Sequence, residues 1–544
     1  MKNGKNIVVC SDGTGNSAVK GRGTNVFKLY EAVDVIGHIG TDECEQVAIY
    51  DDGVGTQKLK PFRIFGGAFG FGLARNVRQL YAEIARIYEA GDRIYLFGFS
   101  RGAFTVRTLA GFIDKVGILD VKNLTTGEVS SEVSRLYREH RKDNRALLEY
   151  FTSFITDIVR SAWRLLLKLI GSGQPDIPPP VIENVPIQFI GVWDTVDAVG
   201  FPVPGIASFW NTVIHKFKFE TSELPKSVVY ACHALAIDDE RASFWPSLWK
   251  KDTAPTGGEA EKKPARMEQA WFAGVHSNVG GGYPKQGMSL VSLDWMMRKA
   301  ESSGSKSQTA APPLRFSRAL RQQYADAQNV TDYLYDSRSG LAVYYRYRPR
   351  DIGALCREAE VPVVIHRSVT DRIRARTRGY APGNLPDSFH RLDGPREGEH
   401  RLVSPADEKD LPDFSGSSGR WVRLRQFTQV GFFAVQAVVI YLAWTATVTD
   451  ELLPASTSDA SILEKAKGWA MQVAELLVAP LPGDWAAARI VQPMFAYPWI
   501  GLLFLAAIVT AYFLGLLGRT RMEAENSERW RRLEIRRAGE PPAS

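Results

Sequence analysis

A five-residue segment centred on Ser100 reads Gly-Phe-Ser-Arg-Gly and matches the G-x-S-x-G pattern of a nucleophile elbow. In such an elbow the serine stands on a sharp turn between a strand and a helix, so that its hydroxyl is exposed. An apolar run at 94–97 precedes the motif, and a helix-like run at 103–113 follows it. This context predicts Ser100 as a nucleophile, with Gly98 and Gly102 as the structural residues of the elbow. An ordinary serine in a turn is the alternative.

A serine hydroxyl is a weak nucleophile at neutral pH and needs a base, usually a histidine that a carboxylate orients. In α/β-hydrolases these groups follow one another along the chain in the order serine, acid, histidine. Asp194 comes directly after a strand-like run at 187–193, and His276 comes directly after another at 269–275. The order Ser100, Asp194, His276 therefore predicts a catalytic triad for the hydrolysis of carboxylic esters.

Two other residues compete for these roles. Asp197 lies just beyond Asp194 and is an alternative acid. His233 falls in an expected helix next to Cys232, where a packed core histidine is favoured over a catalytic base.

The oxyanion that forms during ester cleavage needs two backbone N–H donors. One is expected from Arg101, the residue after the nucleophile. The other is expected from Gly13 or Thr14, in a loop that follows the first apolar run. A phosphate-binding loop is the alternative for this segment, although it lacks the Lys-Ser/Thr ending of a Walker A motif. The triple glycine at 280–282 is either a second phosphate cradle or a flexible support for His276.

These side chains need elements that carry them to one edge of a fold. Short apolar runs alternate with segments whose apolar residues recur at helical spacing. Expected strands lie at 7–10, 47–50, 94–97, 187–193 and 269–275, and expected helices at 24–36, 73–88 and 103–113. This alternation predicts an α/β fold, an α/β-hydrolase-like, mostly parallel sheet with helices on both faces.

The composition argues against several classes of protein and site. Lys and Arg number 67 against 60 Asp and Glu, a net charge of +7, and no dense basic block with interleaved aromatics marks a nucleic-acid interface. The four cysteines lie far apart and form no CxxC pair, which argues against a zinc site. The sequence therefore predicts no nucleic-acid partner, no metal and no cofactor.

The chain of 544 residues is too long for one ordinary domain. We expect a catalytic domain at 1–400 with lid-like insertions at about 120–180 and 200–220, followed by a linker at 401–425.

Two uncharged apolar segments, 427–448 and 499–518, follow that linker. A helix of this length, at about 1.5 Å per residue, crosses a hydrocarbon core of about 30 Å. We therefore expect a two-helix transmembrane hairpin at 426–518 with an external loop at 449–497. Two buried core helices are the alternative.

Basic residues flank this hairpin and are scarce in its loop. The loop at 449–497 holds three Lys or Arg against six Asp or Glu, whereas arginines precede the first segment and the tail at 519–544 is basic. The positive-inside rule then predicts an inner or plasma membrane location, with the catalytic domain and the tail in the cytoplasm.

Longer motifs surround the candidate triad. They lie at 12–14, 50–56, 91–103, 193–196, 238–241 and 275–283. With these motifs the chain resembles, over residues 5–390, an uncharacterised α/β-hydrolase domain family similar to type VI secretion phospholipase effectors. The resemblance implies a phospholipase-like activity and the same triad, Ser100, Asp194 and His276. Ser11 and Gly15 depart from the family pattern at the expected wall of the acyl pocket.

These observations predict a membrane-anchored serine hydrolase, a lipid esterase of the phospholipase or lipase type. Its expected partners are a lipid or other ester substrate and the membrane bilayer. A tethered esterase or thioesterase with a soluble substrate is one alternative, and a non-catalytic membrane scaffold on a hydrolase fold is another, because a fold does not fix a function. The sequence does not determine the oligomeric state.

Overall fold

We describe a computed structural model of the 544-residue chain. It describes residues 4–13, 23–52, 69–140, 179–196, 222–251, 266–306, 312–403, 414–450 and 498–538, except positions 38, 40, 42, 340, 341, 344, 387 and 393–399. The chain divides into two compact units, Met1–Ala406 and Asp407–Ser544.

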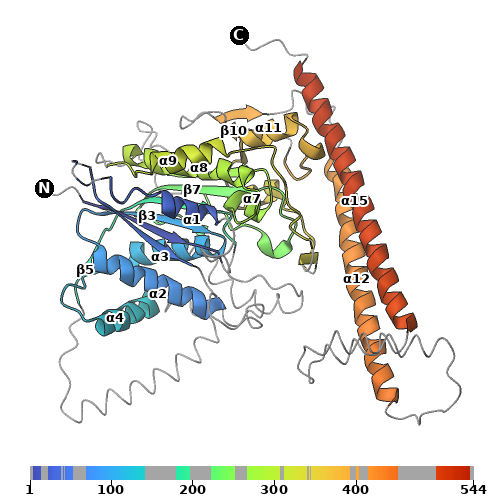
Figure 1. Cartoon of the computed structure of the whole chain (residues 1–544), viewed down its shortest axis with the longest axis horizontal. Coiled ribbons are helices and arrows are strands. Elements are labelled where there is room, and N and C mark those ends of the chain that lie inside the picture. Colours follow the sequence, from blue (N-terminus) through green and yellow to red (C-terminus); the bar gives the residue numbers. More distant parts are fainter. Residues whose placement is uncertain are drawn as a thin grey trace. The chain divides into compact units, whose positions relative to one another are not determined.

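The first unit is built on a sheet in which nine strands are described, in the order β11-β10-β9-β8-β7-β6-β3-β1-β2 (Figure 1). These strands are β1 (Asn6–Ser11), β2 (Gln46–Asp51), β3 (Arg93–Phe99), β6 (Ile187–Trp193), β7 (Val228–Ala236), β8 (Met267–Phe272), β9 (Val364–His366), β10 (Phe389–Leu392) and β11 (His400–Val403). Neighbouring strands run parallel from β2 to β10, and β11 pairs antiparallel with β10. The predicted α/β fold with a mostly parallel sheet is confirmed.

Helices cover both faces of this sheet. The described α-helices of the first unit are α1 (Asn25–Ala32), α2 (Phe69–Ile87), α3 (Arg101–Val116), α4 (Thr126–His140), α7 (His276–Gly280), α8 (Gly287–Ser302), α9 (Arg318–Asp326), α10 (Ile352–Glu358) and α11 (Arg367–Arg374). Short 3₁₀ helices lie at η4 (Ala242–Phe244), η5 (Ser303–Lys306) and η7 (Thr377–Gly379).

The alternation of side chains along a strand divides the core into two layers. Ile7 and Val9 of β1 pack with residues of α2 and α3, whereas Val8 and Cys10 pack with residues of α1 and α8. Figure 1 shows these two helix pairs on opposite sides of the sheet. Because both faces are covered, the central strands are continuous apolar runs that do not alternate with polar residues.

The first expected lid-like insertion includes a helix of the core. The short antiparallel strands β4 (Ile118–Leu119) and β5 (Val181–Ile182) pair with each other around it. Within it, α4 packs against α2 and α3 and buries Val129 and Val133. The remainder of this insertion, 141–178, and the second one at 200–220 lie outside the described residues.

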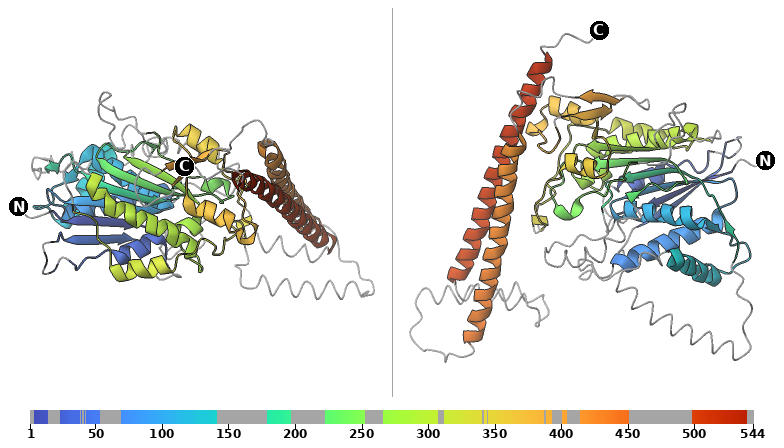
Figure 2. Two further views of the ribbon diagram at one scale, coloured as in Figure 1. Left: turned by 90° about the horizontal axis from the view of Figure 1, so that it is seen from above. Right: turned by 180° about the vertical axis from the view of Figure 1, so that it is seen from behind.

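The second unit contains two long helices, α12 (Phe414–Asp450) and α15 (Pro498–Ala538), which pack side by side (Figures 1 and 2). The Trp421 indole N–H of α12 donates to Glu525 of α15 across 2.8 Å. Gly518 of α15 also lies against the Arg425 side chain of α12. Together, β11 and the start of α12 occupy parts of the expected linker at 401–425.

Across the described residues we find no helix that combines the length and the apolar character needed to span a membrane. The transmembrane hairpin predicted at 426–518 is therefore not supported, although helices lie at both of its segments. Gln429 and Gln436 interrupt the apolar run of α12, and charged residues follow Gly518 in α15. Most of the expected external loop at 449–497 lies outside the described residues.

Candidate active site

Ser100 stands between β3 and α3 in a backbone conformation that few residues other than glycine adopt. Its φ is 58° and its ψ is −118°. Such a conformation costs free energy and persists only where the surrounding structure holds it. Here the Ser100 amide donates to the Trp193 carbonyl of β6 across 3.0 Å, and the helix α3 begins at the next residue. This strand–turn–helix arrangement is the one that the sequence motif predicted.

The two glycines of the motif are required by close backbone contacts. A Cβ atom on Gly98 would lie 2.6 Å from the Gly102 carbonyl oxygen. A Cβ atom on Gly102 would lie 2.1 Å from the carbonyl oxygen of Ser11, at the end of β1. Any larger residue at either position would therefore push α3 away from the sheet.

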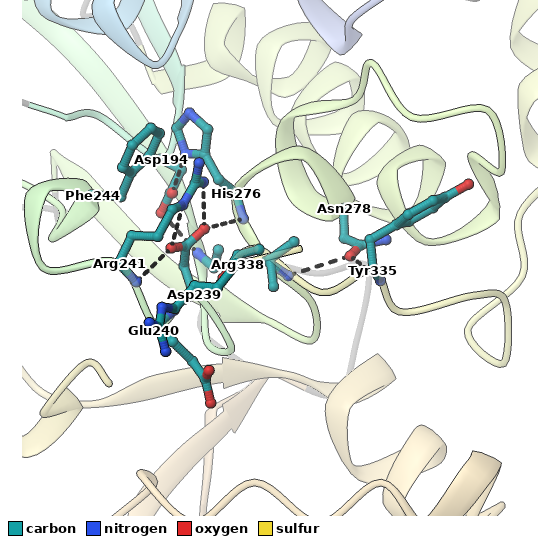
Figure 3. A network of polar contacts seen from close by, with 12 residues as sticks. Asp194, Asp239, Glu240, Arg241, Phe244, His276, Asn278, Tyr335 and Arg338 are labelled. Atoms are coloured by element: carbon teal, nitrogen blue, oxygen red, sulfur yellow. Dashed lines mark hydrogen bonds and ion pairs between the residues drawn. The ribbon is translucent and has the colours of Figure 1, made fainter. Parts of the chain in front are cut away.

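Asp194 and His276 form a buried pair at the carboxyl edge of the sheet. Asp194 follows β6, and His276 begins α7. The Asp194 Oδ2 atom lies 2.5 Å from His276 Nδ1 (Figure 3). The exposed fraction is 0% for Asp194 and 5% for His276. A carboxylate at Nδ1 fixes the orientation of the imidazole and leaves Nε2 available to exchange a proton.

Asp194 is held from several directions. Its φ of 41° is also unusual for a residue with a side chain. Its amide donates to the Ala234 carbonyl across 2.8 Å, and its Oδ1 accepts the Ala236 amide across 3.0 Å. Burial alone would raise the pKa of Asp194, but the adjacent guanidinium of Arg350 holds this pKa well below its usual range. The Asp194 side chain is therefore a carboxylate at neutral pH.

The His276 imidazole lies between two aromatic rings. The Phe99 ring centroid is 4.6 Å from the imidazole centroid, and the Phe244 ring approaches edge-on at 5.1 Å. Burial lowers the pKa of His276, and the Asp194 carboxylate opposes this effect without cancelling it. His276 is therefore neutral at neutral pH, which is the protonation state that a general base requires.

Ser100 shares the sheet edge with this pair. Phe99 pairs in register with Trp193, so Ser100 and Asp194 follow neighbouring parallel strands at the same end. Among the described residues, no hydrogen bond joins the Ser100 hydroxyl to His276. The structure thus brings Asp194 and His276 into contact and places Ser100 beside them. Catalytic hydrogen bonds often tighten only when substrate binds.

The expected oxyanion donors have different surroundings. Arg101 is the first residue of α3. The Gly13 amide donates to the Asp12 carboxylate across 2.6 Å, and that carboxylate also accepts the Tyr50 hydroxyl across 2.8 Å. Thr14 lies outside the described residues. The role of these amides in an oxyanion hole stays a prediction.

Asp197 and His233 are the alternatives to Asp194 and His276 in the triad. Asp197 lies outside the described residues. His233 is fully buried on strand β7, where its Nε2 accepts the Thr195 amide across 3.1 Å and its Nδ1 lies 3.2 Å from Gln269 Oε1. Burial lowers the pKa of His233 to about 3. His233 is therefore a core histidine that supports the turn after Asp194, although the helix expected around it is a strand.

The glycines after His276 make close packing contacts. Neither a flexible support for His276 nor a phosphate cradle would require such contacts. A Cβ atom on Gly280 would lie 2.0 Å from the Phe99 ring. Gly281 has a φ of 85°, and a Cβ atom there would lie 2.7 Å from the Asn25 amide nitrogen. The triple glycine therefore lets α7 approach β3 and α1 closely enough to place His276.

Sequence reasoning missed the charged residues around the pair. Asp239 accepts the His276 amide across 3.2 Å and forms an ion pair with Arg241 across 2.7 Å (Figure 3). Both lie in the motif at 238–241, to which the sequence alone assigns no chemistry. Arg350 contacts Asp194 from a segment with no chemical motif of its own, so only the fold reveals it.

We find no group of three or more His, Cys, Asp or Glu side chains arranged as metal ligands in the part of the chain that the structure describes.

Comparisons with known proteins place these observations in a family. Residues 5–299, more than half of the chain, match the family model described as "T6SS, Phospholipase effector Tle1-like, catalytic domain". The chain is 26% identical over 254 residues to "Uncharacterized protein YEL023C" of Saccharomyces cerevisiae, a match that covers 44% of this chain and 32% of that protein. This chain thus spans about a third of that relative's length.

A crystal structure of an uncharacterized protein from Pseudomonas aeruginosa matches 92% of this chain and 66% of that chain, with 15% identity and a TM-score of 0.35. The segment matched by the family model includes the strand–turn–helix of Ser100, the end of β6 and the helix that begins at His276. The resemblance predicted from the motifs is confirmed, and the chain belongs to the Tle1-like phospholipase effector catalytic domain family.

Proposed function

We propose that the protein is a serine ester hydrolase of the phospholipase type, with Ser100, His276 and Asp194 as its triad. The observation that carries the proposal is the buried Asp194–His276 pair, 2.5 Å apart, at the sheet edge where Ser100 stands in an elbow conformation. The family supports a lipid ester as the substrate, because its description is that of a phospholipase catalytic domain.

In the proposed mechanism the Ser100 hydroxyl oxygen attacks the carbonyl carbon of the ester. His276 takes the hydroxyl proton at Nε2, and the imidazolium that forms is stabilised by Asp194, which stays ionised. The tetrahedral intermediate collapses when the ester C–O bond breaks, and His276 returns the proton to the leaving alcohol. A water molecule then attacks the carbonyl carbon of the acyl-enzyme and gives a proton to His276. The bond to the Ser100 oxygen breaks, His276 returns the proton to that oxygen, and a fatty acid is released.

A fluorophosphonate probe tests whether Ser100 is an activated nucleophile. We expect covalent labelling of the wild-type protein and no labelling of Ser100→Ala. Ser131→Ala is the matched control, because Ser131 is an exposed serine on α4, outside the candidate site, and should leave labelling unchanged. A folded wild-type protein that no such probe labels would favour the non-catalytic scaffold.

The substrate class is tested separately. We expect the wild-type protein, and not Ser100→Ala, to release fatty acid from phospholipid vesicles. Hydrolysis of short soluble esters or thioesters with no release from vesicles would instead favour the soluble-substrate enzyme.

We also propose a location at the cytoplasmic face of an inner or plasma membrane. Large apolar side chains exposed on α12 and α15 support the contact with a membrane, including Phe427, Val430, Val438, Leu502, Leu505, Tyr512 and Phe513. Contiguous exposed apolar surface marks sites that contact lipid or another protein. Replacing Phe427, Leu502 and Phe513 by serine should move the protein from the membrane pellet to the supernatant, whereas wild-type protein in the supernatant would count against this location.

A further inference from the structure

Arg350 is a charged residue buried in the interior of the first unit. Its exposed fraction is 1%, and it lies in the chain between α9 and α10, beyond the family match that ends at residue 299. A guanidinium remains charged in proteins, so its burial is costly unless a carboxylate and further acceptors compensate. The contacts of Arg350 show what compensates it.

The Arg350 guanidinium binds both carboxylate oxygens of Asp194. Its Nη1 lies 2.7 Å from Oδ1, and its Nη2 lies 2.8 Å from Oδ2. Nη1 also donates to the Ala236 carbonyl, and Nη2 donates to the Phe244 carbonyl across 2.5 Å. A bidentate pair of this kind fixes the plane and rotation of the carboxylate. Asp194 Oδ2 is therefore shared between Arg350 and His276 Nδ1.

The other charged groups around the pair have partners of their own. Asp239 is paired with Arg241 across 2.7 Å, and Asp238 accepts the Tyr380 hydroxyl and the Gly274 amide. His233 is uncharged at neutral pH, because its burial lowers its pKa to about 3. Among the described contacts of Asp194, only Arg350 brings a permanent positive charge.

We propose that Arg350 is a positioning residue for the Asp194–His276 pair, which keeps the Asp194 carboxylate ionised and oriented toward His276 Nδ1. The inference rests on the proposed function, since it assigns Arg350 a task in that triad. It also means that the segment after residue 299 completes the site, because the guanidinium reaches Asp194 from there.

Loss of Arg350 has a predictable effect on protonation. The unbalanced Asp194 carboxylate would either raise the pKa of His276 or take up a proton itself. In the first case His276 is protonated at a higher pH than before, and in the second case activity requires deprotonation of a buried carboxyl group. Both cases move the acid limb of the activity profile to higher pH.

The pH profile of kcat/KM for ester hydrolysis by the full chain tests this directly. We expect Arg350→Met to move the acid limb up by about one pH unit or more, because a charge within hydrogen-bonding distance is lost. We also expect kcat to fall about tenfold or more, because the imidazole is less well oriented. The acid limb and the kcat of Arg350→Lys should lie between those of the wild-type protein and Arg350→Met. A lysine keeps the positive charge, but one ammonium cannot bridge both carboxylate oxygens as the guanidinium does.

Arg372→Met is the matched control. Arg372 is an equally buried arginine on α11, with an exposed fraction of 1%, but it donates to the Val330 and Asp332 carbonyls. Its loss should affect folding stability and leave the acid limb in place. A folded Arg350→Met protein with the wild-type acid limb and kcat would overturn the proposal.

A second measurement covers the case in which Arg350→Met folds poorly. If Arg350 neutralises Asp194, then removing both charges in Asp194→Asn/Arg350→Met should raise the melting temperature above that of Arg350→Met alone. Losses that simply add in the double variant would overturn the proposal. This readout needs no enzymatic activity, so it separates a failure of the Arg350 assignment from a failure of the proposed hydrolase function.

Discussion

At Ser100 and Asp194 the chain adopts positive φ angles of 58° and 41° with residues that carry side chains. Both residues come at the ends of neighbouring parallel strands, and each is held by a hydrogen bond to the next strand. Backbone strain of this kind concentrates at functional sites, because it directs a side chain out of the regular sheet. The same local mechanism therefore places both residues, Ser100 at the end of β3 and Asp194 at the end of β6.

The protonation of His276 leads to a prediction at this scale. Burial lowers the pKa of His276 below its ordinary value of about 6.5, and the neutral form acts as the base. Activity should therefore be present above this lowered pKa and be lost as the pH falls through it. We expect the acid limb of kcat/KM, measured with a soluble ester, to lie below about pH 6.5. An acid limb well above this value would contradict the assignment.

At the scale of the elements, the elbow depends on how closely α3 approaches the end of β1. Gly102→Ala places a Cβ atom 2.1 Å from the Ser11 carbonyl oxygen, so the helix must shift. We expect a fall in melting temperature and a loss of kcat of about 10²-fold, because Ser100 moves with the helix.

Gly111→Ala is the control for this substitution. Gly111 lies on the same helix, and a Cβ atom there would have nothing within 4 Å. An alanine in a helix interior is favoured over glycine by about 0.5–1 kcal/mol, so this variant should melt slightly higher and retain activity. Equal losses from both substitutions, measured by thermal melting and ester turnover, would rule out the packing argument.

Strand β7 shows where element prediction from sequence was wrong. A helix was expected around His233, but this residue lies in the buried strand β7, between β6 and β8. Short apolar runs with small residues such as alanine and cysteine do not distinguish a buried strand from a helix by periodicity. The pairing partners on either side, 187–193 and 267–272, decide the outcome.

At the scale of the whole molecule, the first compact unit is larger than the family match. The structure gives a first unit that reaches Ala406, whereas the match ends at residue 299. The intervening segment adds strands β9, β10 and β11 to the sheet and buries Ile352, Ile365 and Val369.

A truncation series tests the extent of this unit. We expect residues 1–406 to unfold in one cooperative transition, as followed by circular dichroism. Residues 1–299 should show no such transition, because the edge of β8 and the Asp194 carboxylate would lose their partners. A folded 1–299 fragment that still reacts with the fluorophosphonate probe would show that the matched segment is sufficient.

The sequence by itself determined the elbow at Ser100, the order of the candidate triad, the parallel α/β sheet and the family. These features depend on local spacing, since a strand, a turn and the residue after the strand lie close together along the chain. Its prediction of a membrane-spanning hairpin at 426–518 was not supported, since none of the described helices combines the length and apolar character that spanning requires.

Tertiary structure alone decided how the site is supported. Asp194 and His276 are 82 residues apart, and Arg350 lies 156 residues beyond Asp194. Nothing in local spacing marks an arginine at that distance as the partner of the Asp194 carboxylate. Burial of Asp194 made a counter-charge necessary, and only the folding of the segment after residue 299 against β7 and η4 shows which residue supplies it.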